Sequence, residues 1–329
     1  MLKFKLKYMI KTGMNVLKSL TCERPVAVIF LFHAIEKASS SWTGGHRYIT
    51  PYETFKKQIE FIHKHFTIVS TTELIKSLKN GLQNKEKIAS IHFDDGFLSY
   101  KEIALPYLKQ LKIVSTVFLI HDVLLGEIPK RNKLAYCMNT EARSLLINRM
   151  QPFIHELGGR HVNLSKMSTA QFLAWSKNNF NCKLEKCVEE VFKDTWNPEI
   201  EKSPFLDLQS ALKIKDDPYV EIGSHTLTHS MLSRLSEEQQ RKEIIDGHKI
   251  FENCFGIESD FFAYPYGGIT HFNEISCRIV QESESIIAFS AYGGVNRKCN
   301  RTDVKRITLS DQSPFGVKAL LANNIVGHE

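Results

Sequence analysis

The sequence lacks several features that would assign it to a specialised class of protein. Its seven cysteines are odd in number and scattered through 329 residues, unlike a secreted disulfide framework. Cys182 and Cys187 have no matching second pair, so we expect free thiols rather than a cysteine zinc site. Internal repeats, low-complexity tracts and nucleic-acid-binding motifs are also missing. These absences favour a reducing cytoplasm and predict no nucleic-acid partner.

A long apolar run is missing as well, but the start of the chain, residues 1–24, has a distinct character. Residues 1–20 contain five lysines and no acid, and their apolar residues can share one helical face: Leu2, Leu6, Met9, Ile10, Leu17 and Leu20. This pattern is typical of a helix lying on an anionic membrane surface, so we expect residues 2–20 to make peripheral contact at the inner face of the cell membrane. A surface helix packed on the domain and a short strand are the other interpretations.

The remaining chain has the composition of one large α/β domain. Hydrophobic residues make up 43% and charged residues 24%, enough to bury a full core. Strand-like runs alternate with helix-like segments, which predicts a parallel sheet or barrel. The expected strands are 26–32, 67–70, 87–93, 114–120, 219–223, 261–264, 286–290 and 304–309, and helices are expected at 51–65, 72–78 and 236–255. Residues 121–203 form a mostly helical insertion, for which a lid or substrate-binding cap and a purely packing role are both open.

Two adjacent aspartates directly follow one of these expected strands. Asp94 and Asp95 follow the apolar run 87–93 and precede Gly96. Ligands and catalytic groups gather at the carboxyl ends of parallel strands, because the strand bodies are packed and the ends are open. Neighbouring residues on an extended backbone point in different directions, so one carboxylate can bind a metal while the other acts as a base. The alternative is an ordinary Asp-Gly turn.

Two histidines follow a second candidate strand. His225 and His229 are four residues apart, so a helical or turn-like backbone would bring both imidazoles to one side. Two histidines and one carboxylate leave coordination positions open, which distinguishes a catalytic zinc-type site from a closed structural one. A helix-starting loop capped by its serine and threonines is the simpler interpretation. Together with the aspartates, these histidines predict a mononuclear metal site.

Three motifs, in order, resemble those of the polysaccharide deacetylases, the family four carbohydrate esterases. They are residues 91–96 (Ile-His-Phe-Asp-Asp-Gly), 223–229 (Gly-Ser-His-Thr-Leu-Thr-His) and 262–267 (Phe-Ala-Tyr-Pro-Tyr-Gly). Residues 31–33, 50–65, 105–106 and 116–119 resemble further family segments, so the resemblance covers most of residues 26–310. It implies that residues 25–329 form a distorted parallel β/α barrel with a helical insertion, and that the enzyme removes an acetyl group from an N-acetylated sugar.

The resemblance also implies a role for each site residue. Asp95, His225 and His229 would hold a divalent metal, usually zinc in the family, and Asp94 would be the base. An amide is a poor electrophile, so the metal has to polarise the carbonyl and acidify water. The backbone N–H of Tyr266, which follows Pro265, would donate to the oxyanion. Read without the family, that segment is simply a turn.

The chain departs from the family pattern at two places. Ala263 stands where the family often has an arginine that orients the base, and Arg306 on the last expected strand is the candidate to replace it. The late Leu-x-x-His-Asp segment, source of the general acid, has no clear match, and His328 lies near the end of the chain. Some family members instead carry this histidine on the first strand, where His33 falls, so we expect His33 to be the acid. A hydrogen-bonded histidine without a catalytic role is the alternative.

These patterns lead to one function and two alternatives. We expect a metal-dependent hydrolase of a carbon–nitrogen bond that deacetylates an N-acetylhexosamine in a surface glycan or its lipid-linked precursor. The alternatives are hydrolysis of another small amide on the same fold, and a glycan-binding protein with a degenerate site. Retention of Asp94 and Asp95 beside His225 and His229 argues against pure binding, which needs no free base beside a metal.

Overall fold

A computed structural model describes residues 25–154, 156, 163–179 and 181–326 of the chain. The basic segment at residues 1–24 lies outside these ranges, so the membrane-contact prediction for residues 2–20 stays a prediction. Within the described ranges, none of the helices combines the length and the apolar character that crossing a bilayer requires.

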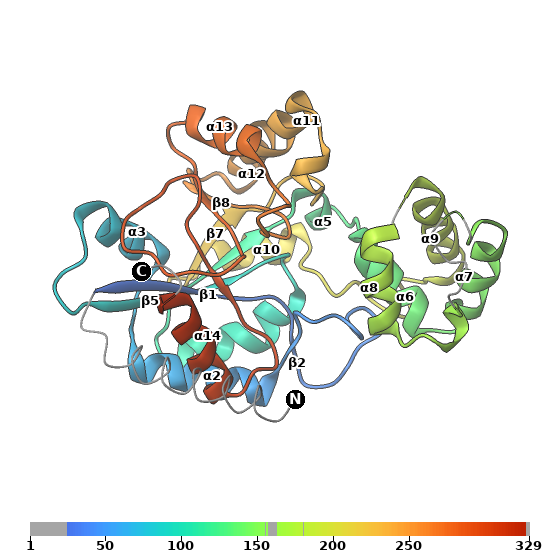
Figure 1. Cartoon of the computed structure of the whole chain (residues 1–329), viewed down its shortest axis with the longest axis horizontal. Helices are drawn as coiled ribbons and strands as arrows, with labels where there is room; N and C mark the ends of the chain where they lie inside the picture. Colours follow the sequence, from blue (N-terminus) through green and yellow to red (C-terminus); the bar gives the residue numbers. More distant parts are fainter. Residues whose placement is uncertain (1–24, 155, 157–162, 180, 327–329) are drawn as a thin grey trace, which may run out of the picture.

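A parallel sheet forms the centre of the protein, with strand order β10-β1-β5-β6-β7-β8-β9 and the short β4 beside β5. The strands are β1 (Val26–Phe32), β4 (Thr67–Ile68), β5 (Lys87–Phe93), β6 (Ser115–Leu119), β7 (Val220–Ser224), β8 (Phe261–Ala263), β9 (Ile287–Phe289) and β10 (Ile307–Thr308). A parallel bridge between Phe289 and Val304 links β9 to the segment leading into β10. The two edges of the sheet therefore approach each other, and the sheet curls into the distorted parallel β/α barrel that the sequence predicts (Figure 1).

Burial on both faces explains why β1 and β5 are continuous apolar runs rather than alternating ones. All seven residues of β1 are buried, and β1 pairs with β5 in register over its whole length. His92 of β5 is buried among packing neighbours, with Nε2 2.8 Å from the Thr71 hydroxyl and its ring 5.0 Å from that of Phe289.

Helices cover the outside of the sheet on both sides (Figure 1). Around the sheet these are α2 (Tyr52–His65), α3 (Thr71–Asn80), a π-helical turn (Tyr100–Ala104), α4 (Leu105–Gln110), α10 (Leu208–Lys215), α11 (Glu237–Arg241), a second π-helical turn (Lys242–Asp246), α12 (Gly247–Phe255), α13 (Glu274–Glu282) and α14 (Pro314–Val326). Capping boxes at Ser70 with Glu73, and at Ser236 with Gln239, fix where α3 and α11 begin.

The insertion forms a separate helical lobe at one side of the barrel (Figure 1). Its helices are α6 (Lys130–Asn139), α7 (Ala142–Met150), α8 (Thr169–Asn179) and α9 (Cys182–Thr195), with short 3-10 turns at Gln151–Phe153 and Leu164–Lys166. The short helix α5 (His121–Leu124), at the start of the insertion, lies beside the barrel, where its first N–H groups bond to the loop after β7. The lobe has its own core, into which Trp42 inserts from the loop between β2 (Ile35–Glu36) and β3 (Thr50–Pro51). The Trp42 ring lies 4.6 Å from that of Tyr136 and 5.7 Å from that of Trp196. The insertion and the β2–β3 loop are therefore one packed unit.

The predicted elements differ from the structure in several places, and strands β4 and β10 are shorter than the runs 67–70 and 304–309 that the sequence predicts. The helix expected at 236–255 is interrupted by the π-helical turn at Lys242–Asp246, which divides it into α11 and α12. Helix α14 was not expected, because its apolar residues are spread around the helix instead of forming one stripe. The two-residue strands β2 and β3 are too short to leave a periodic pattern in the sequence.

Candidate metal centre and active site

The two motif pairs meet at the carboxyl end of the sheet. Asp95 follows β5, and His225 follows β7, with β6 between these two strands. The Asp95 Oδ1 atom lies 3.4 Å from His225 Nε2 and 3.3 Å from His229 Nε2. One ligand atom from each of the three residues lies within 4.8 Å of the others. The structure thus brings together the three residues that the sequence assigns to a metal.

The chemistry of these donors fits a divalent cation. His225 Nδ1 lies 2.8 Å from the Ala263 carbonyl oxygen, which can only accept, so Nδ1 carries the proton and Nε2 offers its lone pair to the centre. Burial alone would lower the pKa of His225, but Asp94 and Asp95 outweigh it and raise that pKa. The centre therefore favours positive charge. Two histidines and one carboxylate match an open catalytic zinc site, although the donor set does not by itself select zinc.

The backbone around the centre is turn-like rather than helical. Among the described residues, seven other than glycine have positive φ, and four of them belong to the motifs: Asp95 (72°), Thr226 (67°), His229 (59°) and Tyr266 (61°). A positive φ is unfavourable for a β-branched or aromatic residue, so such strain concentrates at sites that the surroundings hold in place. His225 and His229 converge through this turn, which is the turn-like alternative that their spacing left open beside a helix.

Glu243 holds the histidine turn in place. Its Oε2 atom accepts hydrogen bonds from the backbone N–H groups of Leu227 and Thr228, each at 3.0 Å, and Oε1 accepts from the Thr228 hydroxyl at 2.6 Å. The Thr226 hydroxyl accepts a further bond from His229 N–H at 3.0 Å. Sequence reasoning missed Glu243, because nothing in the spacing of a helical glutamate indicates that it binds a loop fifteen residues earlier.

Arg306 binds Asp94, the first aspartate of the pair, through two parallel hydrogen bonds. Nη1 donates to Asp94 Oδ1 at 2.7 Å and Nη2 donates to Oδ2 at 2.8 Å, while Nε donates to the Ser290 carbonyl at 2.9 Å. Arg306 is fully buried, and its guanidinium lies 5.3 Å from the centre of the Phe118 ring. An arginine directly before β10 therefore binds Asp94, as the sequence suggests for a chain that has Ala263 in the third motif.

This ion pair determines the charge state of Asp94. Burial would raise the pKa of Asp94, but Arg306, with smaller contributions from His225 and His33, outweighs it and lowers the pKa. The carboxylate is consequently ionised, 3.9 Å from His225 Nε2. A fixed, ionised carboxylate beside the metal ligands has the properties of a general base.

His33 stands at the end of β1 beside this cluster. Its ring stacks on Tyr48 with centroids 5.0 Å apart, and Tyr48 stacks in turn on His46 at 4.6 Å. Burial lowers the pKa of His33 against the raising effect of Asp95 and Asp94, so the resting imidazole is neutral. Its Nδ1 atom is buried without a hydrogen-bond partner among the described residues. An unpaired buried nitrogen is costly, and a bound substrate could satisfy it.

The helical insertion also reaches this site. Burial lowers the pKa of His46 to about 3, and Arg131, in the first turn of α6, adds to this lowering. Burial raises the pKa of Tyr266, and Arg131 acts against that rise. The next residue, Asn132, donates to the Trp42 carbonyl at 3.2 Å. Packing of the lobe thus brings a cation to the edge of the centre, a contribution that no sequence motif signals.

Tyr266 lies beside His229. Its ring is 4.7 Å from that of His229, and the following Gly267 accepts a hydrogen bond from Ala291 N–H at 2.7 Å. A Cβ atom at Gly267 would lie 2.6 Å from the Ala291 nitrogen, so this turn excludes any side chain there. The oxyanion role of the Tyr266 backbone remains a prediction. His328 lies outside the described residues, and the roles of His33 and Asp94 are likewise predictions.

Comparison with known proteins agrees with the sequence motifs. The family model for polysaccharide deacetylase matches residues 188–283, which include His225, His229 and Tyr266 but not the aspartate pair. The Bacillus subtilis protein YxkH, whose name assigns it to the polysaccharide deacetylases, is 31% identical over 64 residues. This match covers 20% of the chain and 22% of YxkH, so it spans about a fifth of either protein.

Solved structures share the fold over almost the whole chain. The Streptococcus pyogenes deacetylase PplD, in complex with acetate, has a TM-score of 0.58 at 16% identity, covering 91% of this chain and 99% of its own. IcaB from Ammonifex degensii has a TM-score of 0.58 at 17% identity, covering 91% and 98%. A de-N-acetylase from Aggregatibacter actinomycetemcomitans reaches 0.56 at 12% identity, covering 90% and 99%. The chain is thus similar to the polysaccharide deacetylases in sequence over residues 188–283 and shares the fold of these solved deacetylase structures over most of its length.

Proposed function

We propose that the protein is a metal-dependent amidohydrolase that removes the acetyl group from an N-acetylhexosamine in a surface glycan or its lipid-linked precursor. The observation that carries this proposal is the convergence of Asp95, His225 and His229 beside the Arg306-bound carboxylate of Asp94. The similarity to PplD and to the Aggregatibacter de-N-acetylase supports the reaction class.

Asp95, His225 and His229 would hold the metal, which we expect to be zinc. When bound, the metal polarises the acetamide carbonyl and activates water for attack. Asp94 accepts the proton of the attacking water, and it can do so because Arg306 keeps it ionised and fixed. The backbone N–H of Tyr266 donates to the oxyanion that forms.

His33 delivers the proton to the leaving amine. The resting imidazole of His33 is neutral. It therefore has to gain a proton during the catalytic cycle, and it then donates that proton to the leaving amine. Its unpaired Nδ1 atom and its position beside the two aspartates support this assignment. The stacked ring of Tyr48 holds the imidazole plane in one orientation.

A degenerate binding protein fits the structure less well than an enzyme does. Ala263 and the absent late histidine are the two arguments for degeneracy, and Arg306, directly before β10, answers the first by supplying a guanidinium to Asp94. Hydrolysis of a different small amide would use the same centre, so product analysis on acetylated sugars and simple amides is needed to separate these two activities.

The test combines elemental analysis with an acetate-release screen on N-acetylated sugars, with and without a chelator. We expect about one divalent metal per chain, turnover that the chelator abolishes, and an Asp94→Asn variant that keeps the metal but releases no acetate. A purified protein that binds no metal and releases no acetate contradicts the proposal and favours glycan binding.

The location of the reaction follows from the predicted membrane contact of residues 2–20. We propose that the protein works in the cytoplasm at the inner face of the membrane, where a lipid-linked precursor is accessible. Co-sedimentation with anionic vesicles, compared between the full chain and a variant with its first lysines changed to glutamine, tests this placement. Equal sedimentation of the two proteins contradicts it.

A further inference from the structure

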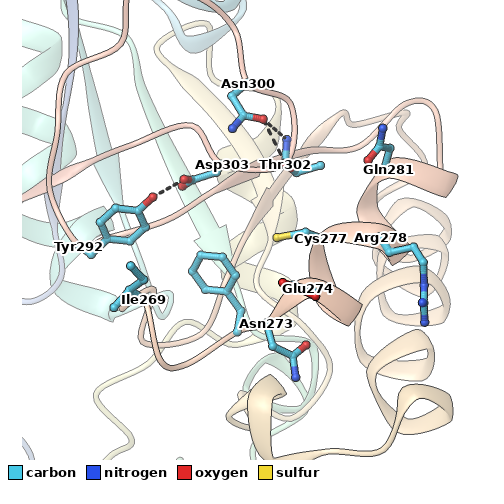
Figure 2. A pocket seen from close by; sticks show the side chains of 11 residues that line it. Ile269, Asn273, Glu274, Cys277, Arg278, Gln281, Tyr292, Asn300, Thr302 and Asp303 are labelled. Carbon is cyan, nitrogen blue, oxygen red and sulfur yellow. Dashed lines mark hydrogen bonds between the residues drawn. The ribbon is translucent and has the colours of Figure 1, made fainter. Parts of the chain in front are cut away.

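A second pocket lies beside the loop that follows β8. It has a volume of about 580 Å³ and is formed by this loop, helix α13 and the segment after β9 (Figure 2). Its lining residues are Ile269, Phe272, Asn273, Glu274, Cys277, Arg278, Gln281, Tyr292, Asn300, Thr302 and Asp303. The loop also carries Tyr266 of the active site, so the pocket and the centre share one structural support. The volume is within the range of about 300–1,000 Å³ that is typical of small-molecule sites.

One wall of the pocket is aromatic and fixed. Phe272 stacks on Tyr264 with centroids 4.1 Å apart and planes 4° from parallel, and the Tyr264 hydroxyl donates to the Thr302 carbonyl at 2.9 Å. Tyr292 lies 6.5 Å from Phe272 with planes 27° apart, and 37% of its surface is exposed. Rigid aromatic surface of this kind packs against the C–H faces of pyranose rings at little entropic cost.

Asp303 supplies a carboxylate beside this wall. Its Oδ2 atom accepts a hydrogen bond from the Tyr292 hydroxyl, as Figure 2 shows, while its Oδ1 atom is buried without a partner among the described residues. A buried oxygen that lacks a donor is destabilising, so a ligand donor placed there gains a strong hydrogen bond. This oxygen therefore marks the position of a donor group on the ligand.

The lining is locally acidic although the chain carries a net charge of +7. Its two acids are Glu274 and Asp303, and neither forms a salt bridge within the described part of the chain. The lining base, Arg278, is paired with Glu237 at 2.6 Å and approaches Glu282 at 3.8 Å, both outside the pocket. Lys305 lies 5.9 Å from the Tyr292 ring centre and does not line the pocket. The lining therefore favours a cationic ligand.

We propose that this pocket binds a pyranose with a free amino group, which is a glycan unit that has already lost its acetyl group. This inference rests on the proposed deacetylase function, whose product is such an amino sugar. An ammonium group can form an ion-paired hydrogen bond with the Asp303 carboxylate, which is stronger than the hydrogen bond that a neutral acetamide N–H can donate to it. A deacetylated unit held here would anchor the glycan while an acetylated unit of the same chain enters the metal centre.

Binding of two defined oligosaccharides tests the inference. A glucosamine tetrasaccharide and an N-acetylglucosamine tetrasaccharide are titrated into the metal-loaded Asp94→Asn protein, in which turnover is blocked, and calorimetry measures the affinities. Asp303→Asn and Tyr292→Ala are added to this background. Tyr292→Phe keeps the ring, and Glu284→Gln removes an exposed acid at the end of α13 outside the lining. Thermal unfolding of each variant verifies that it is folded.

We expect Asp303→Asn and Tyr292→Ala each to weaken binding of the glucosamine oligomer at least tenfold. Asp303→Asn should change the affinity for the acetylated oligomer less than twofold, and Glu284→Gln should change neither. Unchanged affinity for the glucosamine oligomer in both variants, or an equal loss for both oligomers, overturns the inference.

Acetate release from a singly acetylated short substrate, measured on otherwise wild-type protein, separates this inference from the proposed function. Turnover without Asp303-dependent binding overturns the pocket assignment alone. Asp303-dependent binding of the glucosamine oligomer without turnover on any glycan supports the pocket and overturns the deacetylase proposal.

Discussion

Replacing Arg306 by methionine removes the guanidinium that binds both oxygens of Asp94. Arg306 is 0% exposed and Asp94 is 3% exposed, and the two hydrogen bonds measure 2.7 and 2.8 Å. Breaking a buried ion pair from one side leaves an uncompensated charge, which costs about 3–5 kcal/mol of unfolding free energy. At roughly 2–4 °C per kcal/mol for large domains, the melting temperature should fall by on the order of 10 °C.

Arg306→Met should lower kcat and leave KM nearly unchanged. Misplacing a reacting group can lower the rate about 100-fold, so we expect kcat to fall by at least that factor. Arg306 contacts Asp94 and the Ser290 carbonyl, so KM for the acetylated substrate should change less than threefold. Arg306→Lys keeps the charge but not the paired geometry, and it should lie between wild type and Arg306→Met in stability.

A double-mutant cycle provides the decisive comparison. Asp94→Asn removes the negative charge, so the Asp94→Asn/Arg306→Met protein has no uncompensated ion and should be more stable than Arg306→Met alone. Chemical denaturation measures the four unfolding free energies, in metal-free protein so that metal affinity does not contribute. Wild-type stability in Arg306→Met, or a double variant no more stable than that single variant, refutes the reasoning.

Four further predictions concern other parts of the molecule. Glu243→Gln should weaken metal affinity by about 10–100-fold, as changes behind metal ligands do, and equilibrium dialysis would show otherwise if affinity were unchanged. Thr71→Val, which deprives buried His92 of its hydroxyl partner, should cost about 1–3 kcal/mol in urea unfolding, and a neutral effect would contradict the contact. Chelation should lower the melting temperature, because the metal binds only the folded chain, and an unchanged midpoint argues against a metal site. Burial and Arg131 hold the pKa of His46 at about 3, so below pH 6.5 the unfolded chain binds more protons than the folded chain, and the free energy of unfolding falls as pH is lowered. Between pH 6.5 and 5, this fall in unfolding free energy should be about 2 kcal/mol smaller in His46→Gln than in wild type. Parallel pH profiles of the two proteins would refute this prediction.

The strands and the motif residues were predictable because both depend on local chemistry. Strands β1 and β5 coincide with the expected runs 26–32 and 87–93, since burial on both faces requires continuous apolar sequence. Asp94, Asp95 and His225 stand directly after strands, and His229 follows in the loop after the second of them, at the end of the sheet where sites form. The spacing of His225 and His229 left a helix and a turn both open, and the structure shows that a turn with positive φ brings the two rings together.

The partners of the site residues could not be read from local sequence. Glu243 binds the turn from a π-helical segment, and Tyr48 stacks on His33 from a loop that the helical lobe holds in place. Arg306 could be named as a candidate only because the third motif has Ala263 where the family often has an arginine. Such contacts join residues far apart in the chain, so no periodicity or spacing records them.

By itself, the sequence determined which side chains can carry the chemistry and which end of the sheet presents them, because hydrophobic pattern and strand order follow from short-range rules. Only the tertiary structure decided the charge state of Asp94, because it placed a buried guanidinium from residue 306 against a carboxylate of residue 94. The physical reason is that a pKa depends on burial and on the charges nearby in space, and folding alone sets both.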